Sequence, residues 1–262
     1  MLFTIDIGNT NVTMGVYEGE RLRATWRVAT VHDRMPDEYG ILLAQLLTHR
    51  GIAPAAITGV AIASVVPTLT GIFREVSRSY LNQDPLVVDT GVKTGVRIRY
   101  ENPREVGADR VVDCAAVKVK YGGPACVVDF GTATTFDAIT ADGDYLGGAI
   151  APGIGIAAEA LFSRASKLYR VEIAPPSKAI GTNTAMAMQS GIFYGYVGLV
   201  EGMVARFRRE LEGDAERDAG PQMKVIATGG LAERVARETP VIQHVDPWLT
   251  LDGLRIIYEM NR

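Results

Sequence analysis

The stretch that decides the fold is LFTIDIGNTNVTMGVYEGERLRATWRVA, residues 2–29. Hydrophobic and polar residues alternate along much of it, which is typical of half-buried strands. Two short breaks, GNTN at 8–11 and EGE at 18–20, divide it into three segments, and their residue types favour turns. The stretch therefore predicts three antiparallel strands connected by two hairpins.

Helices and strands alternate after these hairpins. Residues 36–51 begin with proline, have helical spacing and end at a glycine, and a second helix is expected over residues 67–81. A strand is expected after each helix, at ITGVAIASVV (57–66) and at PLVVD (85–89). This order predicts an α/β fold.

The same order begins again near residue 104. ACVVDFG, ATTFDAITA and DYLGGAIA, within residues 125–151, predict a second run of three strands. VDFGT at 128–132 aligns with IDIGN at 5–9, so Asp129 corresponds to Asp6. We therefore expect one duplicated unit, with domains at 1–103 and 104–262.

The second half continues with a long helix. Apolar residues keep helical spacing from Phe193 to Phe207, and glycines recur at 191, 195, 198 and 202. Glycine costs a helix about 1 kcal/mol relative to alanine, so these glycines predict close packing, either within the chain or between subunits. The close of the chain predicts a charged surface loop, a strand and a helix, at 212–222, 223–230 and 252–260 respectively.

Composition argues against several classes of protein. The 262 residues carry 27 basic and 30 acidic side chains, a net charge of -3, which is not typical of a nucleic-acid-binding protein. Cys114 and Cys126 lie in apolar segments and are expected to be buried thiols, while the scattered histidines do not predict a zinc site. The sequence lacks an apolar run near the roughly 18 residues that a membrane span needs. A cytoplasmic protein is expected, with neither nucleic acid nor membrane as a partner.

Two acidic turns suggest phosphate chemistry. In DIGNTN (6–11) a carboxylate precedes a glycine turn that offers amide, hydroxyl and backbone donors, and DFGTATT (129–135) repeats that pattern. A carboxylate beside phosphates requires a cation between them, which predicts Mg²⁺ at Asp6. The late ATGGLA (227–232) suits a flat adenine ring against bare backbone. The alternative for each turn is a purely structural hairpin.

GADR at 107–110 suggests an acceptor site. Asp109 is a candidate proton acceptor for an attacking hydroxyl, and Arg110 a candidate partner for an anionic group of the substrate. Asp109 lies near a predicted helix start, so the alternative is a capping residue. Tyr100 is either a ligand contact or a half-buried strand aromatic.

Two acidic hairpins followed by a glycine turn resemble the pattern of the acetate and sugar kinase, Hsp70 and actin superfamily. More specifically, DIGNTN, YENPREVGADR, VDFGTATTFD, GGAIAPG, IGTNTAMAMQSG and ATGGLA resemble, in order and spacing, the type III pantothenate kinase family, also called Bvg accessory factor homologues. The resemblance implies an α/β fold of two duplicated ribonuclease H-like (actin-like ATPase) domains, each with a mixed sheet flanked by helices. It also implies ATP-dependent phosphorylation of pantothenate to 4'-phosphopantothenate, the first step of coenzyme A biosynthesis, in a homodimer formed through the long helix.

Site residues follow from the resemblance position by position. The implied ATP contacts are Asp6, Ile7, Gly8, Asn9, Thr10, Asn11, Val12, Thr13 and Thr132. The implied pantothenate contacts are Tyr100, Gly107, Ala108, Asp109, Arg110 and Thr184. Asp109 is the implied proton acceptor, Asp6 the carboxylate associated with Mg²⁺, and Asp129 the ligand of K⁺ or ammonium. Two alternatives stay open: another kinase or phosphate-ester hydrolase of the superfamily, and a non-enzymatic regulatory accessory protein.

Overall fold

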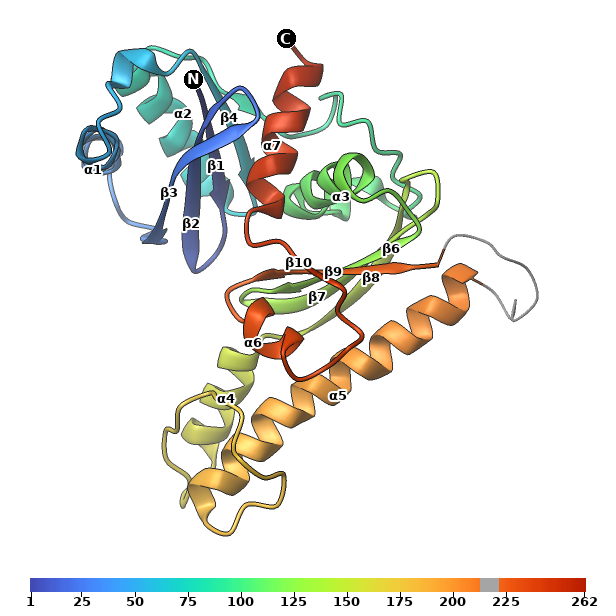
Figure 1. The fold of residues 1–262 in the computed structure, drawn as a ribbon. Helices are drawn as coiled ribbons and strands as arrows, with labels where there is room; N and C mark the ends of the chain where they lie inside the picture. The colour runs from blue at the N-terminus through green and yellow to red at the C-terminus, as the bar shows by residue number, and fades with distance from the viewer. Residues whose placement is uncertain (213–221) are drawn as a thin grey trace. The chain divides into compact units, whose positions relative to one another are not determined.

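The computed structural model describes residues 1–212 and 222–262. It divides into two compact units (Figure 1): Met1–Lys120 together with Trp248–Arg262, and Tyr121–Pro247. The last helix of the chain thus packs with the first unit. The domain boundary expected from the sequence repeat, between residues 103 and 104, differs from this division, which reflects packing. The boundary at 103 and 104 stays a prediction.

A five-stranded mixed sheet forms the centre of the first unit, in the order β3-β2-β1-β4-β5. Its strands are β1 (Leu2–Ile7), β2 (Asn11–Glu18), β3 (Arg21–Ala29), β4 (Gly59–Ser64) and β5 (Leu86–Val87). The three predicted hairpin strands are confirmed, and β4 and β5 run parallel to their neighbours. β4 is shorter than predicted because it pairs residue for residue with the six residues of β1.

Helices cover both faces of this sheet. They are α1 (Pro36–His49) and α2 (Pro67–Leu81) on one face, and α3 (Ala108–Lys120) and α7 (Leu249–Met260) on the other. Successive side chains of a strand point to opposite faces, so Val60 and Ile62 of β4 pack with α1 and α2, whereas Ala61 and Ala63 pack with α3 and α7. Gly253 of α7 lies so close to α3 that an added Cβ would be 2.1 Å from a carbonyl oxygen.

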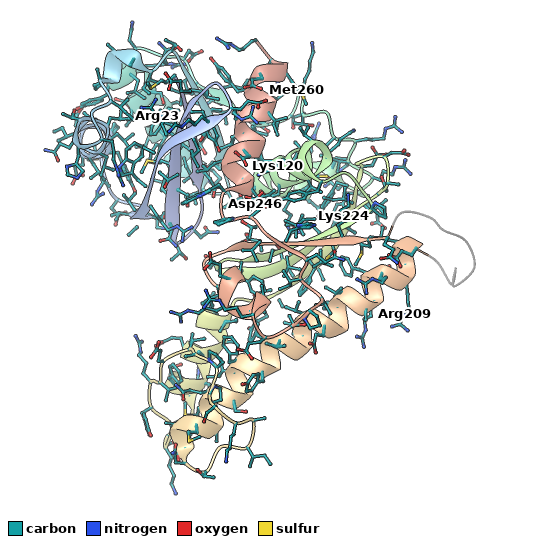
Figure 2. The ribbon with its side chains drawn as sticks, viewed as in Figure 1. Arg23, Lys120, Arg209, Lys224, Asp246 and Met260 are labelled. Carbon is teal, nitrogen blue, oxygen red and sulfur yellow. The ribbon has the colours of Figure 1, made fainter. Side chains whose placement is uncertain are left out.

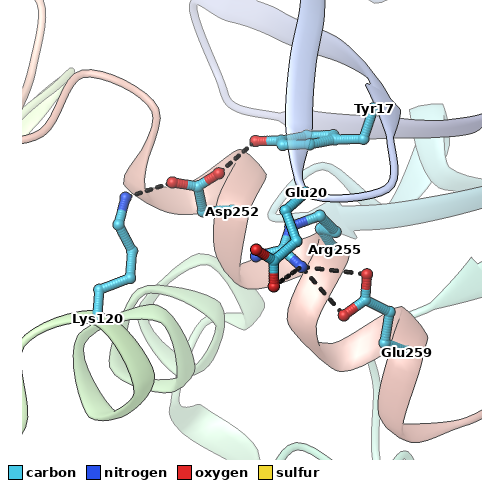
Figure 3. Close-up of polar contacts among 6 residues, drawn as sticks. All are labelled: Tyr17, Glu20, Lys120, Asp252, Arg255 and Glu259. Carbon is cyan, nitrogen blue, oxygen red and sulfur yellow. Dashed lines mark hydrogen bonds and ion pairs between the residues drawn. The ribbon is translucent and has the colours of Figure 1, made fainter.

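Polar contacts also hold α7 in the first unit (Figure 3). Asp252 accepts a hydrogen bond from the Tyr17 hydroxyl at 2.6 Å and forms an ion pair with Lys120 of α3. Arg255, which is buried, pairs with Glu259 one turn further along α7, at 3.0 Å. The helix is thereby linked to both β2 and α3.

The second unit repeats the topology of the first. Its strands are β6 (Ala125–Phe130), β7 (Ala133–Ile139), β8 (Tyr145–Pro152), β9 (Lys224–Gly229) and β10 (His244–Val245). The order β8-β7-β6-β9-β10 matches β3-β2-β1-β4-β5, with the same antiparallel or parallel relation at every step. The predicted duplication is confirmed.

The repeat extends to individual backbone hydrogen bonds. The first hairpin turn of each sheet is closed by one such bond, from the Gly8 N–H to the Asn11 carbonyl and from the Gly131 N–H to the Ala133 carbonyl. A second bond joins that turn to the residue after the third strand, from Thr30 to Thr10 and from Gly153 to Thr132. A third joins the first strand to the residue after its parallel neighbour, from Val65 to Ile7 and from Gly230 to Phe130, and all six are 2.9 to 3.2 Å long.

Among the residues that the structure describes, three helices belong to the second unit. They are α4 (Ile154–Arg164), α5 (Thr184–Glu212) and α6 (Ala232–Ala236). The predicted long helix is confirmed as α5, whose Phe193, Val197, Val200 and Val204 are buried in the core of this unit. Residues 213–221 of the predicted charged loop lie outside the described residues. No helix in the described part of the chain is long and apolar enough to cross a membrane.

The glycines of α5 lie on its outer face. A Cβ added to Gly191, Gly195 or Gly198 would meet no atom of the described residues within 4 Å. Arg209 on the same helix points away from the second sheet (Figure 2). Packing within the described chain therefore does not explain these glycines.

Cys114 and Cys126 are buried and unbridged, as predicted.

Candidate functional site

The first part of the site lies at the turn between β1 and β2. Asp6 is the penultimate residue of β1 and pairs with Thr13 of β2. The Gly8 N–H donates to the Asn11 carbonyl at 3.0 Å, and a Cβ added to Gly8 would lie 3.1 Å from that oxygen. Residues 9–11 are exposed. Successive backbone N–H groups of a turn form a concave surface that can bind phosphate oxygens, and binding of phosphate at this turn stays a prediction.

Two residues of the implied ATP loop have side chains in the core. Ile7 and Val12 are 0% exposed and pack in the interior of the first unit. A nucleotide at this turn would meet only their backbone. Their side chains fix the two ends of the turn instead.

Thr30, directly after β3, also holds this turn. Its hydroxyl donates to the Gly8 carbonyl at 2.6 Å, and its backbone N–H donates to the Thr10 carbonyl at 2.9 Å. No motif in the sequence marks Thr30, because a threonine at the end of a strand is common. The signal that marks Thr30 is its position in the repeat, because it is equivalent to Gly153, the residue after the third strand of the second sheet.

The candidate proton acceptor lies at the same edge of the first sheet. β1 and β4 are parallel, and where both strands end the Val65 N–H donates to the Ile7 carbonyl at 3.1 Å. A Cβ added to Gly107 would lie 3.5 Å from Cγ1 of Val65 and 2.4 Å from Oδ1 of Asp109. Val65 thus connects the turn after Asp6 to the turn that carries Asp109.

The environment of Asp109 suits a base. The residue is half-buried in the first turn of α3, and its Oδ1 accepts a hydrogen bond from the Arg110 N–H at 2.9 Å. Burial raises the pKa of the Asp109 carboxyl, although the bond to the Arg110 N–H and the Arg110 charge act in the opposite direction. A raised pKa makes this carboxylate a better proton acceptor than a fully solvated one.

The remaining implied acceptor contacts of the first unit lie near Asp109 in the chain. Ala108 begins α3, and Arg110 is half-buried within its first turn. Tyr100 is 40% exposed and lies outside the strands, so the alternative of a half-buried strand aromatic is wrong. Gly107 and Tyr100 are thus both in the segment that leads into α3.

The second unit holds the equivalent carboxylate. Asp129 of β6 pairs with Thr135 of β7, as Asp6 does with Thr13, and lies beside Thr228 of β9. Gly229 has φ of +88°, and a Cβ added there would lie 2.4 Å from Oδ1 of Asp129. A Cβ added to Gly131 would lie 3.4 Å from Oδ2. Two glycines therefore leave space around this carboxylate.

Thr132 and Thr184 are the other implied contacts of the second unit. Thr132 is exposed in the β6–β7 turn, and Thr184 is the exposed first residue of α5. Asn183 caps this helix, because its side-chain oxygen accepts a hydrogen bond from the Met186 N–H at 2.9 Å. Asn183 thus stabilises the start of the helix that carries Thr184.

The implied site residues therefore form two groups. The loop at residues 6–13 and the 107–110 turn share one sheet edge in the first unit, while Asp129, Thr132 and Thr184 belong to the second unit. A site formed by both groups stays a prediction. Within residues 1–212 and 222–262, no group of three or more His, Cys, Asp or Glu residues is placed to hold a metal ion.

Comparisons with known proteins agree on a family. The family model described as type III pantothenate kinase matches residues 2–206. The type III pantothenate kinase of Moorella thermoacetica is 54% identical over 261 residues, which covers 100% of each chain.

Solved structures support the expected fold. A Campylobacter jejuni protein described as a Baf family transcriptional activator has a TM-score of 0.63 at 17% identity, covering 99% of this chain and 98% of its own. The inorganic polyphosphate/ATP-glucomannokinase of Arthrobacter sp. strain KM has a TM-score of 0.51 at 14% identity, covering 100% and 99%. At these identities the similarity concerns the fold alone, and the expected α/β fold is confirmed.

Proposed function

Because the chain belongs to the type III pantothenate kinase family, and is therefore a phosphotransferase, we propose that it phosphorylates pantothenate with ATP. The product is 4'-phosphopantothenate, at the entry to coenzyme A biosynthesis. One observation supports this chemistry above the others: the turn after Asp6 and the carboxylate of Asp109 lie at one edge of the first sheet, connected through Val65. A phosphate-binding turn and a base are what phosphoryl transfer to an alcohol requires.

In this proposal Asp109 accepts the proton of the primary hydroxyl as its oxygen attacks the γ-phosphorus. The bond from that phosphorus to the bridging oxygen breaks, and ADP leaves with the electron pair. Arg110 pairs with the pantothenate carboxylate, since a guanidinium fork matches a carboxylate. Tyr100 and Thr184 complete the acceptor contacts. General-base assistance of this kind contributes about 10² to 10⁴ in rate.

Asp6 fits a magnesium ion that arrives with the nucleotide. The turn offers one carboxylate, and Mg²⁺ is commonly held by one or two carboxylates, waters and substrate phosphates rather than by a protein cage. Asp6 would hold the ion, which when bound neutralises phosphate charge. The backbone N–H groups of residues 9–11 would hold the phosphate oxygens beside it.

Asp129 fits K⁺ or ammonium. Gly131 and Gly229 leave a cradle around its carboxylate that a Cβ would fill. Neither hairpin, at residues 6–13 or 129–135, contains a lysine or arginine. A monovalent cation at Asp129 would offset phosphate charge that these loops do not neutralise themselves.

We also propose a homodimer formed through α5. A Cβ added to the outer-face glycines at 191, 195 or 198 would have no atom of the described residues within 4 Å. Glycines also allow two helices to approach closely. The same helix carries Thr184 at its first turn, so a dimer through α5 would bring a second chain near an implied acceptor contact. A cytoplasmic location, expected from the sequence, stays a prediction.

The decisive experiment measures ADP formation by the purified protein, with and without pantothenate, in K⁺ and in Na⁺ buffers. We expect ADP only when pantothenate is present, and faster formation in K⁺. ADP formation with sugars but not pantothenate would assign another kinase of the superfamily, and phosphate release from esters would assign a hydrolase. The absence of turnover with all of these would favour the regulatory alternative.

A further inference from the structure

Thr30 makes two hydrogen bonds to the phosphate-binding turn from outside it. Its hydroxyl donates to the carbonyl of Gly8 at 2.6 Å, and its backbone N–H donates to the carbonyl of Thr10 at 2.9 Å. The side chain is half-buried where β3 ends. The bond from the backbone continues the pairing of β3 with β2, but the bond from the hydroxyl crosses to the end of β1.

These bonds set the direction of the turn's donors. In a planar trans peptide the carbonyl and the N–H of the same peptide group point in opposite directions. With the carbonyls of Gly8 and Thr10 directed at Thr30, the N–H groups of Asn9 and Asn11 are directed away from it. The hydroxyl of Thr30 therefore fixes the peptide between Gly8 and Asn9, which no strand pairing holds.

The second repeat lacks this side chain. At the equivalent position Gly153 donates its N–H to the Thr132 carbonyl at 3.0 Å. A Cβ there would lie 2.3 Å from that oxygen and 2.6 Å from the carbonyl oxygen of Gly131. The second turn thus packs directly on the backbone of Gly153, whereas in the first repeat the Thr30 hydroxyl contacts the equivalent carbonyl, that of Gly8.

We propose that Thr30 is a positioning residue for ATP, whose hydroxyl aims the Asn9 N–H at a phosphate oxygen. The inference rests on the proposed kinase function and adds a residue that does not touch the nucleotide itself. It makes the first repeat, rather than the second, the one in which a side chain controls the phosphate-binding turn.

The test compares Thr30→Val, which keeps the shape and removes the hydroxyl, with Thr30→Ser, which keeps the hydroxyl. Thr48→Val is the matched control, because it removes a threonine hydroxyl that donates to the Ala44 carbonyl at 2.8 Å within α1. We measure KM for ATP, KM for pantothenate, kcat and melting temperature, and the affinity for Mg-ATP by calorimetry without pantothenate.

We expect Thr30→Val to raise KM for ATP and to weaken Mg-ATP affinity about tenfold, the effect of one well-placed hydrogen bond. KM for pantothenate should stay within about twofold, Thr30→Ser should restore ATP affinity, and Thr48→Val should leave it unchanged. If Thr30→Val does not fold, Thr30→Ala provides the same comparison with a smaller side chain.

Wild-type ATP affinity in Thr30→Val, or a failure of Thr30→Ser to restore it, would overturn the proposal. The proposal would also be overturned if Thr30→Val and Thr48→Val lost ATP affinity equally, in parallel with their melting temperatures. These results differ from failure of the proposed function, in which the unmodified protein forms no ADP with pantothenate. Calorimetry with Mg-ATP tests Thr30 in either case.

Discussion

Asp109 occupies a position where two requirements conflict. A carboxylate in the first turn of a helix is favoured by the helix dipole, but burial opposes its charge and raises the pKa of the carboxyl. The folded protein therefore binds this proton more strongly than the unfolded chain does. The contribution of Asp109 to folding stability therefore falls as the pH rises from the ordinary pKa of a carboxyl to the raised pKa of the folded protein. Above the raised pKa the contribution stays at its lower level. Such a cost at a single residue is typical of a functional carboxylate.

Asp109→Asn separates catalysis from stability. We expect kcat to fall about 10² to 10⁴-fold, while Mg-ATP affinity is unchanged and the melting temperature at neutral pH is equal or higher. The asparagine oxygen can still accept the hydrogen bond from the Arg110 N–H. Steady-state kinetics and thermal unfolding at several pH values check this. Near-normal turnover would remove Asp109 from the mechanism, and a lower melting temperature at neutral pH would make it a structural cap.

Gly229 is the residue that tests the cation site. Gly229→Ala adds a Cβ 2.4 Å from Oδ1 of Asp129 and places alanine at φ of +88°. Gly91→Ala is the matched control, since Gly91 has φ of +97° and open space around an added Cβ. We expect the K⁺ concentration for half-maximal activity to rise about 10- to 100-fold in Gly229→Ala and to stay unchanged in Gly91→Ala. Equal K⁺ dependence in both variants would reduce Asp129 to a structural carboxylate.

At the scale of elements, the two hairpin turns are built on the same frame and differ in what supports them. Thr30 contacts the first turn through a side chain, and Gly153 contacts the second through its backbone alone. The end of β8 and the start of α4 therefore pack directly on the second turn. A change at that junction should move the turn without touching Asp129.

Gly153→Ala tests this junction, with Gly155→Ala as the matched control two residues further along. The first adds a Cβ 2.3 Å from the Thr132 carbonyl oxygen, and the second adds one with no neighbour within 4 Å. We expect Gly153→Ala to lower kcat/KM for ATP about tenfold or more, comparable to the cost of overpacking a tight contact. Gly155→Ala should be neutral or slightly stabilising, because alanine is the better helix former. Equal kinetics in both variants would separate this junction from ATP binding.

Elements that carry a pattern over several turns or strands were predictable from the sequence. The hairpin strands alternate, α2 begins and ends at the expected residues, and α5 keeps its apolar spacing. β10 and α6, with two and five residues, are too short to show a period. The site residues of each loop were predicted from motifs, whereas Thr30 acts through a bond between residues 22 positions apart, which spacing alone does not reveal.

For the whole molecule, the sequence left open which sheet the closing helix covers. The apolar face of α7 fits any sheet, and its place in the first unit depends on small residues of β4, the close approach of Gly253 to α3 and the bond from Tyr17 to Asp252. Such contacts join parts of the chain more than 100 residues apart. Local pattern specified the longer elements, and long-range contacts specified their partners.

The outer-face glycines of α5 lead to the last prediction, on the assembly of two chains. If two copies of α5 pack through this face, a bulky side chain there should separate them, so we expect Gly195→Leu to shift the protein from twice the 28.2 kDa of one chain to a single chain. Gly71→Leu is the matched control, since Gly71 is also an exposed helical glycine, in α2, with no neighbour within 4 Å.

Light scattering after size-exclusion chromatography measures the mass, and ADP formation by each species shows whether activity needs the dimer. A Gly195→Leu protein that keeps the mass of the unmodified one would place the subunit interface elsewhere, whereas dissociation of both variants would point to general destabilisation rather than to this face.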